Sequence, residues 1–496
     1  MSWIGRIARN ASFTLTAQVV SRLLRMFYLI LLARQLSAAD FGFYNFGFSL
    51  ALILTSLSNL GLETMIVREV VRCQERAGSY LGSALLFKAL LSLPILGVLA
   101  LLGIWLDYSA PRQVALLLIG LGLVLRELVE LLMGIIRAHQ RMEWEIALTA
   151  AEGVLLLASF ALAVLGRTGF TGLFVAYALT YAGQALLALA LVSWRFVRPV
   201  ISRAAFWRQM RDDLALLRAS APVGMANFAG VLNNNGAALL MPFIRDEVET
   251  GIYGAAFSLV KGFLLLPRSL GIAALPVFSR LYVSSRESLR AAFERAFKLA
   301  WVGILPVSIA TWALAAPLIR LLYDARYESA AAPLRFLGLS FTAMLLNTLC
   351  ANLLIAADEQ RIASAARTVS IALNLVPLLV LTPRGGAMGA ALALLISHTL
   401  LLALAIYAIQ TRVFACRWGE ILVKPTLAGV ACLLVLYALG RWSPWLAAPA
   451  AAAVYVVALI ALRVISASEW ALIVAAWRGL GRWRRRAIET RKEPTS

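Results

Sequence analysis

The sequence has 496 residues, of which 61% are hydrophobic and 14% are charged, and its formal net charge is +21. So much apolar sequence exceeds what a soluble protein can bury, and the apolar runs are continuous rather than alternating, which excludes a closed β-barrel. Because the basic residues lie between these runs, the positive charge does not indicate a nucleic-acid partner. The four cysteines lack ligand or disulfide spacing, so neither a metal nor a cofactor is expected. The composition predicts an all-α polytopic membrane protein.

About fourteen apolar spans follow in chain order, in two groups of six and a final pair. They lie near residues 13–33, 41–62, 80–102, 114–136, 146–166, 171–193, 219–244, 251–277, 297–318, 333–356, 364–382, 387–410, 421–439 and 446–465. The predicted organisation is an N-terminal six-helix lobe (1–193), a basic cytoplasmic linker (194–218), a C-terminal six-helix lobe (219–410), helices 13 and 14 (411–465) and a basic cytoplasmic tail (466–496).

The loops predict the orientation in the membrane. With a cytoplasmic N-terminus, the inside loops and termini hold about 31 Lys and Arg and the outside loops about eight, so both ends are expected in the cytoplasm. Arg6 and Arg9 precede an apolar run as in a signal peptide, but Arg22 and Arg25 interrupt that run, so residues 1–12 are expected to be retained. The basic tail suits either an interfacial helix on anionic membrane lipid or a topology anchor, and the anchor is favoured.

An internal repeat relates the two groups of six spans. Two motifs recur at a constant offset of 209 residues: Gly42-Phe43-Tyr44 with Gly251-Ile252-Tyr253, and Phe48-Ser49-Leu50 with Phe257-Ser258-Leu259. Both copies open an even-numbered span on the outside face, so the two lobes enter the membrane with the same polarity. This pattern predicts a parallel repeat whose pseudo-twofold axis lies along the membrane normal.

The first span carries two arginines near its middle. Arg22 and Arg25 share a helix face with Gln18, and each arginine costs roughly 2.5–3.5 kcal/mol at the bilayer centre. They either line a water-filled cavity or reach back to the cytoplasmic interface, and the cavity is the favoured interpretation. At the repeat offset Arg25 corresponds to Asn234, which follows Asn233. The two lobes are therefore expected to carry polar residues at matched depth.

Helix eight supplies basic groups from the second lobe. Lys261 and Arg268 are seven residues apart and share a face, and Pro267 with Gly271 is expected to loosen this helix. Basic groups from one helix of each lobe would make a cationic cavity. Such a cavity would attract a diphosphate, since arginine can bind its oxygens through paired hydrogen bonds.

Span four contains Arg126, Glu127 and Glu130. Arg126 and Glu130 lie one turn apart and are interpreted as a neutralising pair, which leaves Glu127 as the better candidate for coupling to H⁺ or Na⁺; Glu130 is kept as a second candidate. The acidic loop residues are interpreted as ordinary solvated charges. These are Asp107, Asp246, Glu247, Glu249, Asp324 and Glu328.

Two absences narrow the class of protein. The sequence contains no GxxxxGK[ST] motif, so no ATPase is predicted within the chain. The longest loop spans about 25 residues and is too short for a catalytic domain. We therefore expect a transporter rather than an enzyme.

A resemblance to a known family lies in the segment that joins the first two spans. LARQL at 32–36 followed by DFGFYNF at 40–46 resembles the signature of Wzx-type polysaccharide flippases of the MOP transporter superfamily, and LGL at 60–62 with IVRE at 66–69 resembles its continuation. Ser37 stands where that signature usually has a glycine. The resemblance covers essentially the whole chain, including the plan of two six-helix lobes and two further helices.

The resemblance implies a V-shaped fold that carries an oligosaccharide linked to undecaprenyl diphosphate, such as an O-antigen or exopolysaccharide unit. Transfer would run from the cytoplasmic to the periplasmic leaflet of a bacterial inner membrane by alternating access, with a polysaccharide polymerase as a candidate partner. The residues expected to bind the diphosphate are Arg22, Arg25, Lys261 and Arg268, and those expected to bind sugar hydroxyls are Gln18, Asn233 and Asn234. The alternatives are a lipid II flippase of the same fold, a multidrug/cation antiporter and a membrane polysaccharide polymerase.

Overall fold

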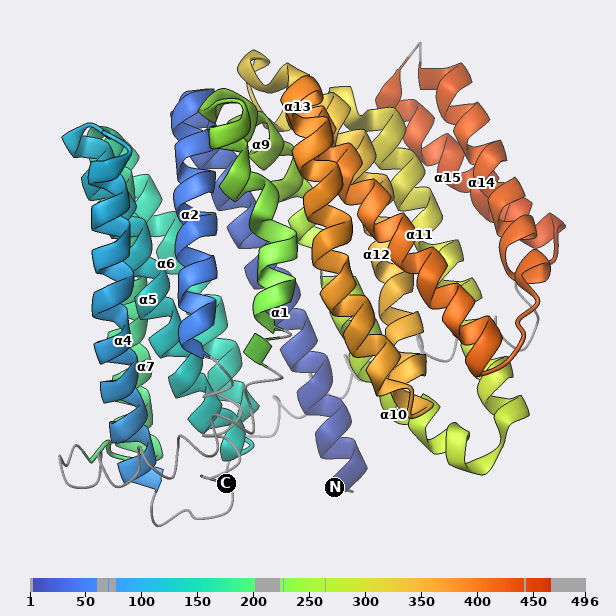
Figure 1. The fold of residues 1–496 in the computed structure, drawn as a ribbon, viewed down its shortest axis with the longest axis horizontal. Coiled ribbons are helices and arrows are strands. Elements are labelled where there is room, and N and C mark those ends of the chain that lie inside the picture. The colour runs from blue at the N-terminus through green and yellow to red at the C-terminus, as the bar shows by residue number, and fades with distance from the viewer. Residues whose placement is uncertain are drawn as a thin grey trace, which may run out of the picture.

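The computed structural model describes residues 3–59, 70, 77–200, 224–225, 227–263, 265–440 and 443–464. Within these ranges the regular structure is entirely helical, without a strand (Figure 1). The prediction of an all-α fold is therefore confirmed. Residues 201–218 of the predicted linker and the predicted tail at 466–496 lie outside the described residues, so the domain boundaries there stay predictions.

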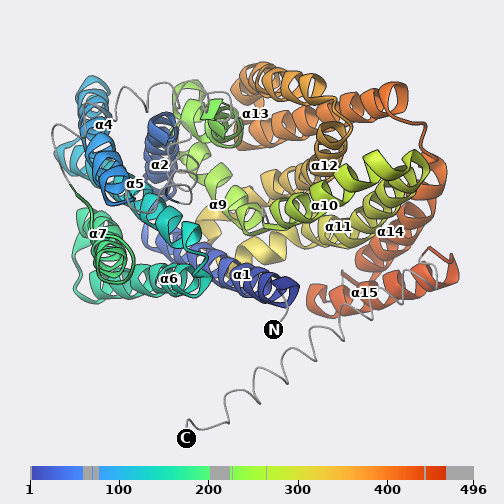
Figure 2. The same cartoon turned by 90° about the horizontal axis from the view of Figure 1, so that it is seen from below.

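The helices form two lobes and a peripheral pair (Figures 1 and 2). The N-terminal lobe contains α1 (Trp3–Gln35), α2 (Ala38–Asn59), α4 (Ala77–Trp105), α5 (Ala110–Ala138), α6 (Met142–Leu165) and α7 (Gly169–Arg195). The C-terminal lobe contains a helical stretch at 227–244, then α9 (Glu247–Phe263), α10 (Leu265–Ser284), α11 (Arg286–Leu322), the 3₁₀-helix η2 (Ala325–Ala330), α12 (Ala331–Ala356) and α13 (Gln360–Arg412). The peripheral helices α14 (Trp418–Gly440) and α15 (Pro444–Ala461) pack on each other and on α11.

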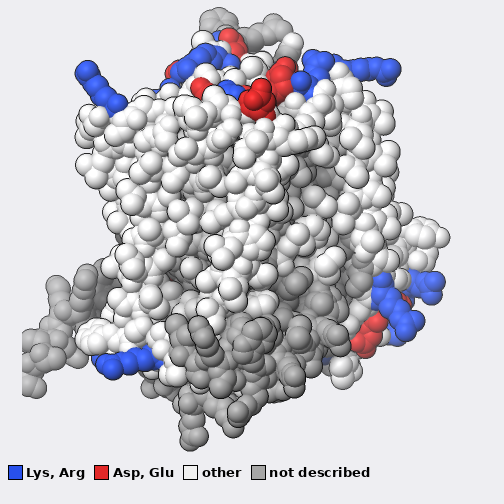
Figure 3. Space-filling model, turned by 60° about the vertical axis from the view of Figure 1, so that its left-hand side comes forward, with Lys and Arg blue, Asp and Glu red and all other residues white. Residues whose placement is uncertain are grey.

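The surface has the character of a multi-pass membrane protein. Eight of the described helices are long and apolar enough to span a bilayer. Neither α1 nor α5 is among them, and each carries ionisable residues in its middle. On the face drawn in Figure 3, charged side chains gather at the two ends of the molecule and an uncharged band separates them. Such a band is what a hydrocarbon core requires of a protein surface.

The predicted spans can be followed in the helices. The span expected at 251–277 is covered by α9 and α10, between which residue 264 lies outside the described residues. The two spans expected at 364–382 and 387–410 are the two helices of α13, which meet at a kink at Gly386, whose φ of 53° lies in the left-handed region. A Cβ atom there would lie 2.4 Å from a Glu249 carboxylate oxygen, so this turn requires glycine. Glu249 accepts a hydrogen bond from the Ala387 backbone N–H at 2.6 Å, so its interpretation as a solvated charge was wrong.

The repeated glycines lie where the two lobes meet. Helices α2 and α9 pack together, and Gly42 and Gly251, at the repeat offset, lie in this contact. A Cβ atom on Gly42 would lie 1.7 Å from the Glu247 carbonyl oxygen, and one on Gly251 would lie 2.0 Å from the Ala38 carbonyl oxygen. In each copy of the motif the glycine, which has no side chain, therefore allows the backbone of the opposite helix to approach closely.

Adding a methyl group at this crossing is expected to separate the lobes. Gly42→Ala meets backbone that cannot rotate away, and overpacking of this kind costs about 1–3 kcal/mol, roughly a 5- to 150-fold shift in population. In a cysteine-free background, spin labels at Asp107→Cys and Arg384→Cys, both exposed, should report a longer distance. Gly183→Ala is the matched control, because a Cβ atom there meets nothing within 4 Å. An unchanged distance in Gly42→Ala would contradict this role.

A second set of contacts joins the lobes where α1 and α11 end. Arg34 donates to the carbonyl oxygens of Leu321 and Leu322, both at 2.8 Å. In return, Arg326 donates to the Arg34 and Leu36 carbonyl oxygens at 3.1 Å, and the Tyr327 hydroxyl donates to the Ala33 carbonyl at 3.1 Å. The last carbonyls of a helix lack partners within it, so each lobe satisfies the helix end of the other.

An ion-pair bridge closes the same end of the molecule. Arg112, near the start of α5, contacts Asp40 of α2 at 3.0 Å and Glu247 of α9 at 2.9 Å. The interpretation of Glu247 as a solvated charge was therefore wrong, since it links the lobes through Arg112. We call the end where α2 and α9 begin the closed end, and the opposite end, where the first described residues of α1 lie, the far end (Figure 1).

Candidate functional site

A polar cavity of about 550 Å³ lies beneath the closed end, with walls from α1, α2, α5, α6, α7 and α9. Its ionisable lining consists of five basic and four acidic side chains: Arg22, Arg25, Arg126, Arg137 and Lys261, with Glu127, Glu130, Glu145 and Glu152. The lining reaches Arg137 and Glu145, beside the α5–α6 turn near the far end, where the Glu130 side chain is 36% exposed. The cavity therefore extends from beneath the closed end toward the far end of the molecule.

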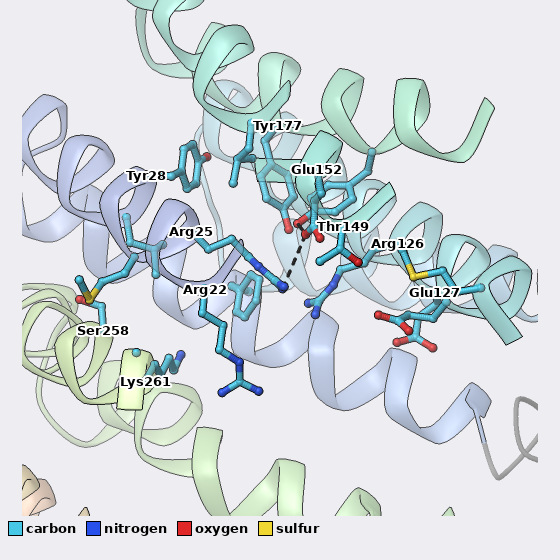
Figure 4. A pocket seen from close by; sticks show the side chains of 18 of the residues that line it. Arg22, Arg25, Tyr28, Arg126, Glu127, Thr149, Glu152, Tyr177, Ser258 and Lys261 are labelled. Carbon is cyan, nitrogen blue, oxygen red and sulfur yellow. Dashed lines mark hydrogen bonds and ion pairs between the residues drawn. The ribbon is translucent and has the colours of Figure 1, made fainter. Parts of the chain in front are cut away.

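Basic residues from both lobes meet in this cavity. Arg22 of α1 and Lys261 of α9 extend into it from neighbouring helices (Figure 4). The Lys261 ammonium lies 5.0 Å from the ring centre of Phe257 and 5.6 Å from that of Phe48. It makes no ion pair with any residue that the structure describes. The expected meeting of helix one with helix eight is thus present in the fold, and Lys261 presents its charge without a carboxylate beside it.

Arg25 differs from Lys261 because it has an acidic partner. Its guanidinium lies 3.6 Å from the Glu152 carboxylate and donates to the Ser21 hydroxyl at 3.1 Å. Glu152 is 5% exposed and also accepts a hydrogen bond from the Tyr181 hydroxyl at 3.0 Å. Arg126 interacts electrostatically with the same carboxylate. One buried carboxylate therefore offsets charge from two arginines.

The two glutamates predicted to couple ions both have basic partners. Glu127 pairs with Lys88 at 3.1 Å, and the Lys88 side chain is only 3% exposed. Glu130 pairs with Arg137 at 3.2 Å, and Arg137 also contacts Glu145 at 3.0 Å. Glu130 also interacts electrostatically with Arg126, as predicted, so both arginines offset its charge. Ion coupling at Glu127 or Glu130 stays an untested prediction.

The predicted sugar-binding asparagines lie in a second hollow of about 640 Å³, which Lys261 also lines. Asn233 and Asn234 both border it, and the Asn374 side chain donates to the Asn233 carbonyl oxygen at 2.8 Å. The helix backbone is described at Gln18 and Arg268, but their side chains lie outside the described residues.

Several ionisable residues of the site escaped the sequence analysis. Lys88 and Glu152 each lie within a predicted span, at 80–102 and 146–166, and a charge inside a span is itself a signal of a functional or paired residue. The tyrosines around Glu152 gave no such signal, because tyrosine is common in any buried helix face. The cavity is also less cationic than expected, with a surplus of one positive charge among its lining residues.

Two family models match the chain, each over more than half of its length. The model described as "Polysaccharide biosynthesis protein" matches residues 7–282, and the model described as "Lipid II flippase MurJ" matches residues 214–466. No curated protein matches.

Solved structures share the fold at low sequence identity. The lipid II flippase MurJ in an inward closed conformation has a TM-score of 0.72 and 13% identity, covering 90% of this chain and 98% of that one. An inward-facing multidrug resistance MATE family transporter of the MOP superfamily has a TM-score of 0.62 and 15% identity, covering 79% and 94%. An outward-facing transporter of that family has a TM-score of 0.52 and 13% identity, covering 83% and 95%.

The family matches and the apolar helices define a multi-pass membrane protein of the flippase class. The chain belongs to the family described as polysaccharide biosynthesis proteins, and its second half belongs with the lipid II flippase MurJ family.

Proposed function

We propose that this protein translocates an oligosaccharide linked to undecaprenyl diphosphate, an O-antigen or exopolysaccharide unit, across a bacterial inner membrane. The observation that carries the proposal is the meeting of Arg22 and Lys261, one from each lobe, in one polar cavity beneath the closed end. A diphosphate is the part of such a lipid that cannot cross hydrocarbon unaided, and basic side chains at low dielectric attract it strongly. A ligand held by both lobes would also be sensitive to their relative position.

The closed end supports transport by alternating access. If both termini are cytoplasmic, as the loop charges predict, the cavity faces the cytoplasm in this state. Opening the other end requires separation of α2 from α9 and release of the Arg34, Arg112 and Arg326 contacts. The arginine contacts are polar, so water can replace them as the lobes rock apart. The glycan would then reach the periplasmic leaflet while the prenyl chain stays in lipid.

A lipid II flippase is the second candidate. The match of the MurJ model to residues 214–466 favours it, and lipid II carries the same undecaprenyl diphosphate group. A multidrug/cation antiporter is less well supported, because the cavity has more basic than acidic side chains. Competition between lipid II and an O-antigen-type lipid for the purified protein would separate the two flippase functions.

The proposal is tested by lipid translocation in reconstituted vesicles. Wild-type protein should move a fluorescent undecaprenyl-diphosphate-linked sugar between leaflets faster than protein-free vesicles do. Lys261→Met removes one charge-assisted contact, worth about 1.5–3 kcal/mol, so the rate at limiting lipid should fall roughly 10- to 150-fold. Lys424→Met, at an exposed position on the peripheral helix α14, is the matched control. Wild-type rates no higher than those of empty vesicles would refute the function, and a fully active Lys261→Met would refute the role of Lys261.

A further inference from the structure

One wall of the cavity, within the N-terminal lobe, is built from tyrosines around a carboxylate. Tyr28 of α1 and Tyr177 and Tyr181 of α7 surround Glu152 of α6, and we call these four residues the tyrosine compartment. The ring centres of Tyr177 and Tyr181 are 5.0 Å apart and those of Tyr28 and Tyr177 are 6.5 Å apart. Figure 4 shows Tyr28, Tyr177 and Glu152 on the same side of the pocket. Each of these tyrosines is only 3% exposed, so the wall is deep and rigid.

Polar atoms of this wall lack protein partners. The hydroxyls of Tyr28 and Tyr177 and the Nε of Arg25 are buried and have no hydrogen-bond partner of good geometry among the described residues. Leaving a buried hydroxyl or N–H unpaired is unfavourable by about 1–3 kcal/mol per group. Three such groups at one cavity wall indicate that the wall is built to face a polar ligand.

The mixture of donors and acceptors identifies the ligand class. Tyr28 and Tyr177 can each donate and accept, Arg25 Nε only donates, and the Glu152 carboxylate only accepts. A prenyl chain offers no hydrogen bonds, and a diphosphate offers acceptors alone, so it could not donate to Glu152. A cationic drug would meet Arg25 and Arg126. Sugar hydroxyls both donate and accept, so a neutral sugar ring matches this wall.

The compartment adjoins the basic residues at the lobe junction. Arg22, Lys261 and the four compartment residues line one continuous cavity, whose volume of about 550 Å³ lies within the range of about 300–1,000 Å³ typical of small-molecule sites. In a diphosphate-linked glycan the first sugar is bonded directly to the phosphate, so its site must adjoin that of the diphosphate. We infer that the tyrosine compartment binds the phosphate-proximal sugar of the lipid-linked glycan, an inference that rests on the proposed function. This places sugar recognition in the N-terminal lobe, rather than at the predicted Asn233 and Asn234.

The test compares two lipids on purified protein. The probes are undecaprenyl diphosphate alone and the same lipid carrying one sugar, from a panel of glucose, galactose, N-acetylglucosamine and N-acetylgalactosamine. Wild-type protein should bind at least one glycosylated lipid more tightly than the bare lipid. Tyr28→Phe with Tyr177→Phe should weaken the binding of that glycosylated lipid roughly 10- to 100-fold, since each lost hydrogen bond changes the affinity about three- to tenfold. The affinity for the bare lipid should not change.

The variant is designed to fold. Neither hydroxyl has a hydrogen-bond partner of good geometry among the described residues, so their removal should lower the unfolding temperature little. Tyr407→Phe, on a side chain 69% exposed in α13, is the matched control. The inference would be overturned if the double variant weakened the binding of both lipids equally or of neither. It would also be overturned if wild-type protein bound no glycosylated lipid more tightly than the bare lipid.

The same assay tests the proposed function separately. If Lys261→Met still weakens the binding of the bare lipid in these cases, the diphosphate part of the proposed function stands. If wild-type protein binds none of the lipids, the proposed function itself fails.

Discussion

Glu127→Leu is expected to destabilise the protein by about 3–5 kcal/mol, because it strands the ammonium of Lys88 in a buried position. Lys88 is 4% exposed, and its Nζ bonds only the Glu127 carboxylate at 3.1 Å and the Glu127 carbonyl oxygen at 2.9 Å among the described residues. Removing one member of a buried ion pair leaves the full desolvation penalty of the other. Thermal unfolding of purified protein and its abundance in membranes should both report the loss.

A second substitution separates a structural role from ion coupling. Replacing both partners of a buried ion pair by apolar groups is often neutral, so Lys88→Met with Glu127→Leu should restore stability. If the pair is structural, lipid translocation returns with stability. If Glu127 binds the driving ion instead, the double variant would be stable and yet inactive, and the sequence-based hypothesis of ion coupling would be preferred.

The second large effect is expected at the arginines of α1. Arg22→Gln with Arg25→Gln would remove the two charge-assisted contacts that we propose for the diphosphate. Each is worth about 1.5–3 kcal/mol, so translocation should fall by a factor of 100 or more, about 2.7 kcal/mol or above. The vesicle assay used for Lys261→Met measures it. Arg22→Lys with Arg25→Lys keeps the charge but loses the paired hydrogen bonds, and an intermediate rate is expected.

Glu152 supplies the control for this experiment. Without Arg25, the buried Glu152 carboxylate retains Tyr181 and Arg126 but loses its contact at 3.6 Å, which lowers stability. Adding Glu152→Gln should return the protein to normal abundance and leave translocation below that of Glu152→Gln alone. Normal translocation in the double arginine variant at normal abundance would instead show that α1 takes no part in diphosphate binding.

The helices could be predicted from the sequence because they depend on local hydrophobicity, and the two lobes could be predicted because a motif repeats along the chain. The spans at 80–102 and 171–193 lie inside α4 and α7, and the offset of 209 residues paired Gly42 with Gly251 before any contact was known. A repeated glycine signals close backbone approach, but it does not say which backbone approaches. The structure supplies the answer, since each glycine packs against the helix that carries the other.

The partners of charged residues could not be read from spacing. Arg126 and Glu130 are one turn apart, yet Glu130 also bonds Arg137, and Glu127 bonds Lys88, which lies 39 residues earlier on α4. Helical spacing defines which side chains share a face, whereas the partner across that face depends on how neighbouring helices pack. The interpretation of Glu247 and Glu249 as solvated charges was wrong for the same reason. Their position in a loop suggested solvent, whereas in the fold Glu247 contacts Arg112 and Glu249 accepts a hydrogen bond from the Ala387 N–H.

The sequence by itself determined that this chain is a helical membrane protein of two lobes, because the apolar spans and their repeat are local features of the chain. It also indicated that the basic residues in helices one and eight face a cavity or a partner, because a charge within an apolar span can be placed only where water or a partner reaches it. Only the tertiary structure decided which of those charges are already neutralised, which end of the molecule is closed, and that tyrosines surround Glu152. Those properties arise from contacts between residues far apart in the chain, and the energy of a buried charge depends on those contacts rather than on its neighbours in sequence.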